Sequence, residues 1–588
     1  MIYPIKNNDP ALSENAIRLL QSRYLRKGVD GLSLETPDDM FRRVAKAVAQ
    51  AELSWGGLQE VKQWEDAFYT TMRHLFFLPN SPTLMNAGTT ANQLSACFVL
   101  PIQDSLENIF DMLKWTALIQ QSGGGTGFNF SNLRPKDAYL NKTSGTASGP
   151  LSFIKIFDAA TEYIKQGGKR RGANMGILSI THPDIEVFIT SKQSNGVLRN
   201  FNLSVDITDD FMKAVENDLS WQLVHPMSQQ GERKIAARTL WDLIAQCTWA
   251  SGDPGLLFLD TINKYNPTPS IGLIDSTNPC GEVPLLPYES CTLGSLNLPK
   301  FILNTKSSRE FNWNLLTETI KTAIRFLDDC VEINNYPMPE IKKMAYANRK
   351  IGLGVMGWAD ALGMLSIPYD SEEAVKLAER LMKFIQEQSH ETSRHLADQR
   401  GAFNNWKDSI YAPDYPIRNA TCTSIAPTGS ISIIANTSAS IEPWFGLAYQ
   451  RKHVLNDETL PEINSVLKEH FQTYYPESHA ILEEILLSGS LKNLALPTET
   501  RRLFKTSLEI APIWHIRHQA AFQHFTDNAV SKTINIPESS SVADIKELYW
   551  TAWKMQLKGV TIFRDKCKPS PISQGLSAHA EVCSMCTR

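Results

Sequence analysis

The sequence predicts an α/β fold with parallel strands. Short apolar segments such as Gly176–Ile180 and Phe201–Ile207 are typical of buried strands, and amphipathic helical segments alternate with such strands over most of the chain. Ile351–Gly357 is a glycine-rich apolar segment, as expected for a closely packed strand. The chain has 588 residues, 42% of them hydrophobic, so it can form several domains or one large α/β barrel with appendages.

Charge and composition exclude some classes of protein. The formal net charge of −4 gives no reason to expect binding to nucleic acid or to an anionic membrane, so local basic groups must hold any anionic ligand. Nine cysteines in this length do not indicate a disulfide scaffold. The start lacks a charged segment followed by an apolar one, and no run of eighteen apolar residues is present. We therefore expect a cytoplasmic protein, in which a cysteine pair is more often catalytic than structural.

The first third of the chain begins with helices. Residues 1–75 show apolar spacings of three and four, which predict a helical region. Residues 80–88 (NSPTLMNAG) are predicted to form a polar turn, and Ser105 is predicted to cap a helix over residues 106–121. The glycine cluster Ser122–Asn129 allows the backbone to approach a ligand closely, although it fits neither the Walker nor the dinucleotide pattern.

Two helices, a strand and a turn are predicted in the second half of the chain. Residues 315–334 form an amphipathic helix, and Asp370 with Glu373 predicts the start of a long helix that ends near residue 398. A strand is predicted over Thr421–Ala426, and a strand-to-helix turn follows it over Pro427–Ser432. Amides and hydroxyls at such a helix start can bind phosphate, but an ordinary helix cap would have the same composition.

The segment Asn278–Glu282 is the main candidate for catalytic residues. It places an amide, a thiol and a carboxylate at every second residue, and in an extended chain all three would point the same way. Proline and glycine favour an exposed or cavity-facing loop instead of a regular helix or a central strand. A thiol between a hydrogen-bonding amide and a basic carboxylate suits a polar substrate with removable hydrogens, whereas the alternative is a turn with a buried cysteine. A second cysteine, Cys291, follows.

Two further segments are candidates for binding or redox chemistry. The loop 166–174 holds basic residues between glycines, which suits an anionic ligand, although a solvated turn has the same composition. Residues 566–588 are rich in Pro, Ser, Gly and Ala, which predicts a mobile tail that ends with Cys583 and Cys586. With His579 this pair offers three zinc ligands but no evident fourth, so zinc remains an alternative for the tail and no other metal site is predicted.

Taken together, these segments resemble the catalytic subunit of ribonucleotide reductase over residues 76–565. The motifs occur in the order of that family: NSPTLMNAG with Cys97 downstream, SGGGTGFN, NPCGE followed by Cys291, NRKIGLGVMGWADAL, APTGSIS and a C-terminal cysteine pair. The resemblance implies a ten-stranded α/β barrel of two five-stranded halves, with Cys280 at the tip of a central finger loop. It also implies three regions: a helical region at 1–75, the catalytic barrel at 76–565 and a flexible redox tail at 566–588.

The resemblance also implies roles for single residues. Cys280 would become a thiyl radical that removes the 3′-hydrogen of the ribose, and Glu282 would take the 3′-hydroxyl proton as general base. Asn278 would hold the ribose hydroxyls. Cys97 and Cys291 would assist the loss of the 2′-hydroxyl as water and supply the electrons, and they would end as a disulfide. Cys583 and Cys586 would reduce that disulfide with electrons from thioredoxin or glutaredoxin.

Substrate and effector contacts follow from the same resemblance. The substrate would lie against Ser81, Ala96, Cys97, Gly125, Asn278, Pro279, Cys280, Gly281, Glu282, Pro427, Thr428, Gly429, Ser430 and Ile431. A deoxynucleotide effector at the interface of a homodimer would contact Asp104, Ser105, Arg134, Lys169, Arg170 and Arg171, with loops 143–150 and 166–174 carrying the signal. The region before residue 76 is too short for an ATP-binding activity switch, so we expect control of specificity alone.

The source of the radical distinguishes the kinds of reductase in this family. The diiron-dependent kind uses a tyrosine pair near the C-terminus, but Gly559–Arg564 contains no tyrosine. Neither the terminal segment nor the four-cysteine zinc site of the glycyl-radical kind is visible. Elimination leaves the adenosylcobalamin-dependent kind, although no D-x-H-x-x-G sequence supplies a cobalt-ligating histidine. The alternatives are a diiron-type large subunit that needs a partner chain and a non-catalytic nucleotide-sensing barrel.

Overall fold

The computed structural model describes most of the chain. The described residues are 12–140, 144–166, 170–194, 196–304, 309–451, 460–475, 479–568 and 572–574. Lys169, His579, Cys583 and Cys586 lie outside them, and for Arg170 and Arg171 only the backbone is described.

One half of a barrel is formed by five parallel strands that neighbour one another in chain order. Each strand is followed by a helix or a longer connection that returns the chain to the same edge, as parallel pairing requires. The strands of this first half are β2 (Cys97–Val99), β3 (Gly125–Asn129), β8 (Asn174–Ser179), β9 (Phe201–Asp206) and β12 (Gly255–Leu257).

The other half also runs parallel within itself. It contains β15 (Ser290–Asn297), β18 (Ile351–Met356), β21 (Thr533–Ile536) and β22 (Gly559–Arg564), and the bridges Leu353–Thr423 and Ile425–Val530 join β18 to the segment before β21. The halves meet antiparallel at β2 with β15 and at β12 with β22, which closes the ring. A short strand, β1 (Phe77–Pro79), pairs with β15 beyond its contact with β2. The predicted ten-stranded barrel of two halves is confirmed.

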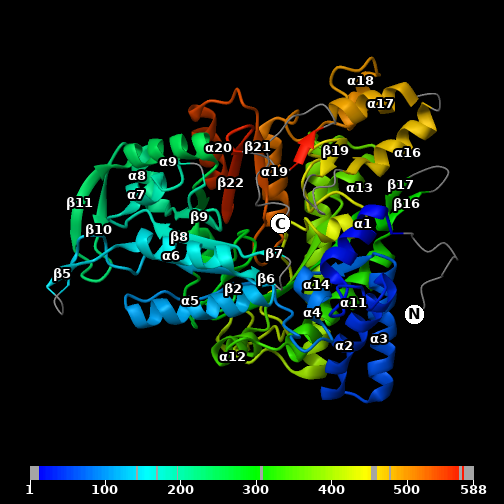
Figure 1. The fold of residues 1–588 in the computed structure, drawn as a ribbon, viewed down its shortest axis with the longest axis horizontal. Helices are drawn as coiled ribbons and strands as arrows, with labels where there is room; N and C mark the ends of the chain where they lie inside the picture. Colours follow the sequence, from blue (N-terminus) through cyan, green and yellow to red (C-terminus); the bar gives the residue numbers. More distant parts are fainter. Residues whose placement is uncertain are drawn as a thin grey trace.

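Helices cover the outside of the barrel, and Figure 1 shows those of the first half on one side and the N-terminal helices with α11 and α14 on the other. The two sides have separate hydrophobic cores, one of which joins the N-terminal helices to the second half of the barrel. The helices around the barrel are α5 (Leu106–Gln121), α6 (Pro150–Tyr163), α7 (Ile185–Thr190), α8 (Asp209–Glu216), α9 (Ala237–Ser251), α10 (Leu259–Lys264), α11 (Trp313–Ile333), α12 (Pro339–Asn348), α13 (Trp358–Met364), α14 (Glu372–Arg400), α15 (Ile431–Ala435), α19 (Pro512–Gln523) and α20 (Val542–Lys554).

The remaining elements lie at the N-terminus or in small appendages. Near the N-terminus are α1 (Glu14–Leu19), α2 (Pro37–Ala49), α3 (Leu58–Arg73) and α4 (Ser81–Asn86). A separate apolar cluster includes residues of α16 (Ser465–Tyr474), α17 (His479–Ser488) and α18 (Thr498–Leu503). The small sheets are β4 (Tyr139–Leu140) with β5 (Gly145–Thr146), β6 (Lys165–Gln166) with β7 (Arg170–Arg171), β10 (Ser220–Val224) with β11 (Gly231–Ala236), β13 (Ser276–Thr277) with β14 (Pro284–Leu285), β16 (Ile302–Asn304) with β17 (Arg309–Phe311), and β19 (Ala448–Arg451) with β20 (Leu460–Ile463) and β23 (Ile572–Gln574).

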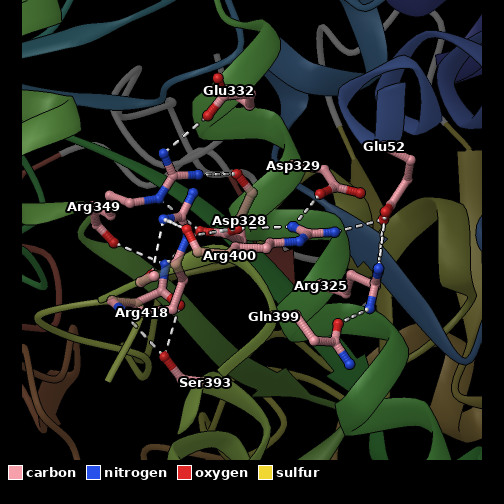
Figure 2. A network of polar contacts seen from close by, with 12 residues as sticks. Glu52, Arg325, Asp328, Asp329, Glu332, Arg349, Ser393, Gln399, Arg400 and Arg418 are labelled. Carbon is pink, nitrogen blue, oxygen red and sulfur yellow. Dashed lines mark hydrogen bonds and ion pairs between the residues drawn. The ribbon is translucent and has the colours of Figure 1, made fainter. Parts of the chain in front are cut away.

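A buried network of charges joins the N-terminal helical region to the barrel helices (Figure 2). Glu52, in the turn of 3₁₀ helix after α2, accepts hydrogen bonds at 2.6 Å from both Arg325 of α11 and Arg400 of α14. Arg400 also binds Asp328 at 2.9 Å and Asp329 at 2.7 Å. The network therefore connects residues that are distant in sequence, and the side chains of Glu52, Arg400, Asp328 and Asp329 are buried in it.

Three local predictions are wrong. Residues 81–86 form a helix and not a turn, because Asn80 accepts a hydrogen bond from the Thr83 amide and caps it. Ser371, not Asp370, caps α14, while Asp370 pairs with Lys505 at 2.6 Å. The segment 421–426 makes only single bridges, since its successive residues pair with different neighbours. The long amphipathic helix and the glycine-rich strand are confirmed as α11 and β18.

Candidate active site

Two cysteines lie side by side where the halves of the barrel meet. Cys97 in β2 and Cys291 in β15 are directly paired across the antiparallel junction. Both are buried and carry no disulfide. Directly opposed residues have their Cβ atoms about 4.5–5.5 Å apart, so the two thiols can form a disulfide after a small movement. The barrel thus brings together the two cysteines that the resemblance made redox partners.

Cys280 lies in the turn that connects β13 to β14, a hairpin that contacts β2, β3 and β8. The Gly281 amide donates to the Asn278 carbonyl at 3.1 Å, and Gly281 has a φ of +79°, a conformation that favours glycine. The Val283 amide donates to the Asn278 side chain at 3.0 Å. A turn, rather than an extended chain, therefore carries the motif.

The three side chains of the motif differ in their burial. Cys280 is exposed, whereas Asn278 and Glu282 are buried at 3% exposure each. The extended conformation, in which all three side chains would point the same way, is therefore not adopted at this segment. The prediction of a loop is confirmed.

The glycine cluster provides room for this hairpin. A Cβ at Gly127 would lie 1.7 Å from the Thr277 carbonyl oxygen, and a Cβ at Gly125 would lie 2.8 Å from the Pro279 ring. Asn202 of β9 donates to the Pro279 carbonyl at 2.8 Å. The glycines thus admit the finger loop itself, whereas the sequence suggested only that they admit a ligand.

Burial of the site favours the protonated, neutral forms of its carboxyl and thiol groups. Burial raises the pKa of Glu282 to about 7, although a hydrogen bond from Asn278 lowers it. Its Oε2 atom is buried and has no hydrogen-bond partner among the described residues. Burial likewise raises the pKa values of Cys97 and Cys291, and the nearby Glu282 raises them further. A buried carboxyl oxygen without a partner can accept a proton from a bound substrate.

The predicted substrate residues lie on several elements. Ser81 begins α4 directly after β1, and its hydroxyl lies 2.8 Å from that of Tyr24. The Ala96 carbonyl accepts from the Gly125 amide at 2.8 Å, which places both at the cysteine pair. Thr428 has a φ of +56° in the turn before α15, and α15 contacts β1. Parts of this set that are far apart in sequence are therefore neighbours in the barrel.

The predicted effector residues lie elsewhere. Asp104 and Arg134 form an ion pair at 2.7 Å, and Ser105 caps α5 by accepting from the Asn108 amide. With sixteen residues, α5 is about 24 Å long, and its other end leads into the glycine cluster. The structure thus separates these residues from the cysteine pair by one helix.

Sequence reasoning missed one polar residue that connects these two regions. Asn174 of β8 accepts from Gln120 of α5 at 2.8 Å and from Thr126 of β3 at 2.7 Å, and it donates to Thr161 of α6 at 3.0 Å. It is the last residue of the basic loop 166–174. No local signal could identify it, since an asparagine in a strand gives no indication of its distant partners.

Within the described part of the chain, one group of residues has the geometry of metal ligands, namely His390, Cys422 and Asp527. Asp527 already accepts hydrogen bonds from the His390 ring at 3.0 Å, from Gln386 at 2.9 Å and from the Cys422 amide at 2.8 Å. These contacts account for the cluster as a structural clamp between α14 and the barrel.

No helix in the described ranges is long and apolar enough to cross a membrane.

Comparisons with known proteins agree on one family. The family model described as "Ribonucleotide reductase, barrel domain" matches residues 95–416 and 412–563, and "Ribonucleotide reductase, all-alpha domain" matches residues 11–92. A vitamin B12-dependent ribonucleoside-diphosphate reductase of Thermoplasma acidophilum is 45% identical over 95% of this chain and 80% of its own length. One of Mycobacterium tuberculosis is 46% identical over 94% of this chain and 79% of its own length.

A solved structure is similar over nearly the whole chain. The class Id ribonucleotide reductase alpha subunit of Actinobacillus ureae matches with a TM-score of 0.76 at 25% identity, and the match covers 94% of this chain and 97% of that one. A ribonucleoside-diphosphate reductase alpha subunit of Chlamydia muridarum is 28% identical over 94% of this chain.

Proposed function

Since the chain belongs to the ribonucleotide reductase family, we propose that it uses adenosylcobalamin to reduce ribonucleoside diphosphates to 2′-deoxyribonucleoside diphosphates. This reaction supplies precursors for DNA. The observation that carries the proposal is the buried cluster of Glu282 with the Cys97–Cys291 pair, with the exposed Cys280 close enough to act on Cys97 electrostatically. The relatives named as vitamin B12-dependent, at 45–46% identity, favour this kind of reductase over a diiron-type large subunit. The buried cysteine pair beside Glu282 likewise gives no support to a non-catalytic sensor.

Open space beside Cys280 fits a bulky cofactor. Cys280 is exposed at the tip of its turn, and a Cβ built on Gly281 would meet nothing within 4 Å. Cys280 and Gly281 would therefore face the cofactor. When bound, adenosylcobalamin supplies a carbon-centred radical that can take a hydrogen atom from a thiol.

The residues of the finger loop then act on the ribose. Cys280, as a thiyl radical, takes the 3′-hydrogen, and the buried Glu282 takes the 3′-hydroxyl proton through its unpartnered Oε2. Asn278 orients Glu282 and the ribose hydroxyls. Exclusion of water strengthens each of these interactions, because the surroundings have a low dielectric constant.

The cysteine pair completes the reduction. A thiol of the pair donates the proton with which the 2′-hydroxyl leaves as water, and the two cysteines supply two electrons and become a disulfide. Cys280 returns its hydrogen atom to the 3′-carbon and is regenerated. Cys97 and Cys291 are exposed by only 2% and 1%, so a folded reductase protein has no direct access to them. This burial supports a role for Cys583 and Cys586 as carriers of electrons from thioredoxin or glutaredoxin.

The substrate phosphates would lie on the turn Pro427–Ile431, whose amides precede α15. The helix is short, so the support here comes from its neighbourhood: α15 contacts β1, which leads directly to Ser81. Ser81, Ala96 and Gly125 would line the ribose and base.

Specificity control would operate at a homodimer interface. Helices α5 and α6 pack together and expose apolar side chains. Large exposed apolar patches mark sites of protein–protein interaction. The exposed residues are Leu106, Phe110, Leu118, Ile156 and Tyr163. Asp104, Ser105 and Arg134 lie at the start of α5, next to this surface, where they would contact the effector. Lys169, Arg170 and Arg171 would carry to the substrate site the signal of which effector is bound.

Assay of the single purified chain with adenosylcobalamin, dithiothreitol and each ribonucleoside di- and triphosphate tests the proposal. We expect deoxynucleotide formation from the diphosphates without a second protein. Cys280→Ser should abolish turnover and retain nucleotide binding, because a hydroxyl does not form the required radical at accessible energy. Activity that requires a second chain, or full activity of Cys280→Ser, would overturn it.

A further inference from the structure

A lysine continues the row of active-site residues across the barrel wall. In the parallel pair of β15 and β18, Thr292 lies opposite Ile351, so the preceding residues Cys291 and Lys350 are neighbours. Cys291 in turn lies opposite Cys97. Opposed residues of adjacent strands project from the same face of a sheet. Cys97, Cys291 and Lys350 therefore form one row inside the barrel.

Lys350 is held in place by a buried carboxylate. Its Nζ lies 2.6 Å from Oε2 of Glu289, and the two side chains are 1% and 2% exposed. Glu289 also accepts from the Asn348 side chain at 2.5 Å and from the Leu286 amide at 2.6 Å. Because burial of an ion pair brings no general gain in stability, stability alone does not explain a buried lysine beside Cys291.

The charges that face the two sulfurs differ. Burial raises the pKa of Cys291, and Glu282 and Glu289 raise it further, but Lys350 opposes them and lowers it. Burial also raises the pKa of Cys97, which faces Glu282, Cys280 and Cys291 and receives a hydrogen bond from Asn278. A thiolate is a better leaving group when its negative charge is stabilised. Lys350 thus makes Cys291 the better leaving group of the pair.

We propose that Lys350, positioned by Glu289, directs the re-reduction of the Cys97–Cys291 disulfide, so that the incoming dithiol attacks Cys97 and Cys291 departs as the thiolate. A thiolate of the dithiol bonds to Sγ of Cys97, the bond between Cys97 and Cys291 breaks, and Cys291 takes up the proton that the attacking thiol released. The second thiol of the dithiol then displaces Cys97. The dithiol ends oxidised by two electrons and both cysteines end reduced. The inference rests on the proposed function only in requiring that this disulfide forms.

Mapping of the trapped intermediate tests which sulfur is attacked. The full chain is oxidised, treated with a limiting amount of the monothiol 2-mercaptoethanol, quenched with iodoacetamide, and digested for mass spectrometry. We expect the mercaptoethanol adduct on Cys97 and the alkyl group on Cys291. An adduct found mainly on Cys291 would overturn the proposal.

Variants distinguish an electrostatic role of Lys350 from a structural one. Lys350→Met should slow reduction of the disulfide by dithiothreitol about tenfold, because the thiolate loses its neighbouring cation, whereas Lys350→Arg should retain most of the rate. Glu289→Gln should raise the rate, since it removes a negative charge near Cys291 while its amide oxygen can still accept a hydrogen bond from Lys350. A purely structural ion pair predicts that Glu289→Gln and Lys350→Met slow the reaction alike, and that result would refute the assignment.

A double variant controls for a failure to fold, and the assay conditions make the test independent of the proposed function. If Lys350→Met does not fold, the double variant Glu289→Gln/Lys350→Met leaves no buried unpaired charge and should still be slow; a wild-type rate there would refute the proposal. All of these rates are measured on the oxidised protein without cofactor or nucleotide. They therefore do not depend on whether the chain reduces ribonucleoside diphosphates.

Discussion

The proposed role of Glu282 as a base comes at the expense of stability. Burial holds its pKa at about 7, compared with 4.5 for an ordinary glutamate, so between these values the folded state binds a proton that the unfolded state does not. Stability must then fall as the pH rises from 4.5 through 7. Above pH 7 the buried carboxylate costs roughly 3 kcal/mol, from 1.36 kcal/mol for each unit of the shift.

Replacement of Glu282 by glutamine should therefore separate activity from stability. Glu282→Gln is expected to lose a hundredfold or more in kcat, as is typical for loss of a general base, and to gain stability at pH 8 but little at pH 4. Urea unfolding at the two pH values measures this, with Glu289→Gln as a second buried carboxylate for comparison. Equal changes in stability at both pH values would contradict the assignment of the raised pKa.

The same shift determines the pH dependence of the wild-type reaction. A base must be deprotonated, so kcat/KM should rise with pH up to about 7 and then level off. Measurement of kcat/KM between pH 5.5 and 8.5 checks this expectation. A profile that is flat through pH 7 would exclude Glu282 as the base.

At the scale of elements, the finger loop depends on the two glycines of β3, Gly125 and Gly127, which have no side chain. Gly127 faces the Thr277 carbonyl at a distance that leaves no space for a methyl group, and Gly125 faces Pro279. The hairpin β13–β14 can approach the cysteine pair only because β3 presents backbone at these positions. The position of Cys280 is thus a property of two elements together.

Introduction of a methyl group at this contact should displace the loop. Gly127→Ala is expected to reduce kcat strongly and to destabilise the fold by about 1–3 kcal/mol, the usual range for overpacking. Gly272→Ala is a suitable control, because its Cβ would meet only Leu286 at 3.5 Å. Activity and thermal unfolding of the two variants check this. A Gly127→Ala variant with wild-type kcat would show that the loop does not require this close contact.

The basic loop and Asn174 form the second element of interest. Asn174 binds α5, α6 and β3 together at the place where the loop rejoins the barrel. The two-stranded hairpin of β6 and β7 carries Arg170 and Arg171, and β6 contacts α5. A signal from the start of α5 can therefore reach the glycine cluster through contacts that are present in the structure.

Substitution in this loop should alter the choice of base more than the rate. Coupling between sites is commonly about 1–3 kcal/mol, so Arg171→Ala is expected to flatten the effector dependence by several-fold or more while retaining the unstimulated rate on at least one substrate. Rates on four substrates, with and without each deoxynucleotide, measure this. A solvated turn predicts no change, and a catalytic phosphate clamp predicts uniform loss; either pattern would refute the assignment.

At the scale of the whole molecule, the N-terminal helices and the barrel are joined by charge as well as by apolar packing. Arg400 lies between Glu52 of the N-terminal region and Asp328 and Asp329 of α11 (Figure 2). Burial acts against the charge of Asp328, yet Arg349, Arg418 and Arg400 hold its pKa below the usual range. Removal of one member would leave the charges of its buried partners less well compensated.

Removal of Glu52 should therefore destabilise the molecule severely. Glu52→Ala is expected to cost about 3–5 kcal/mol, as for other buried pairs that lose one partner. Asp66→Ala, which removes an exposed ion pair with Lys62 on α3, should change stability little. Urea unfolding of both variants provides the comparison. Similar midpoints for the two would mean that the network does not join the two regions energetically.

The sequence by itself determined most elements and the family, and it supplied the candidates for the reacting groups. Periodicity identified α11, β8 and β9, and the motif around Cys280 with its resemblance to a known family identified the chemistry. These features are local, because hydrophobic spacing and turn residues act within a few positions along the chain. The errors at Ser81 and Asp370 are also local, since a neighbouring residue provided the better cap.

Only the tertiary structure decided which of these groups meet. Closure of the barrel places Cys97 opposite Cys291, and Lys350 beside Cys291, through strand registers that no local pattern encodes. The raised pKa of Glu282 is likewise a result of its burial and not of its sequence neighbours. The physical reason is that register and burial depend on contacts between segments far apart in the chain, whereas propensity and spacing act only along it.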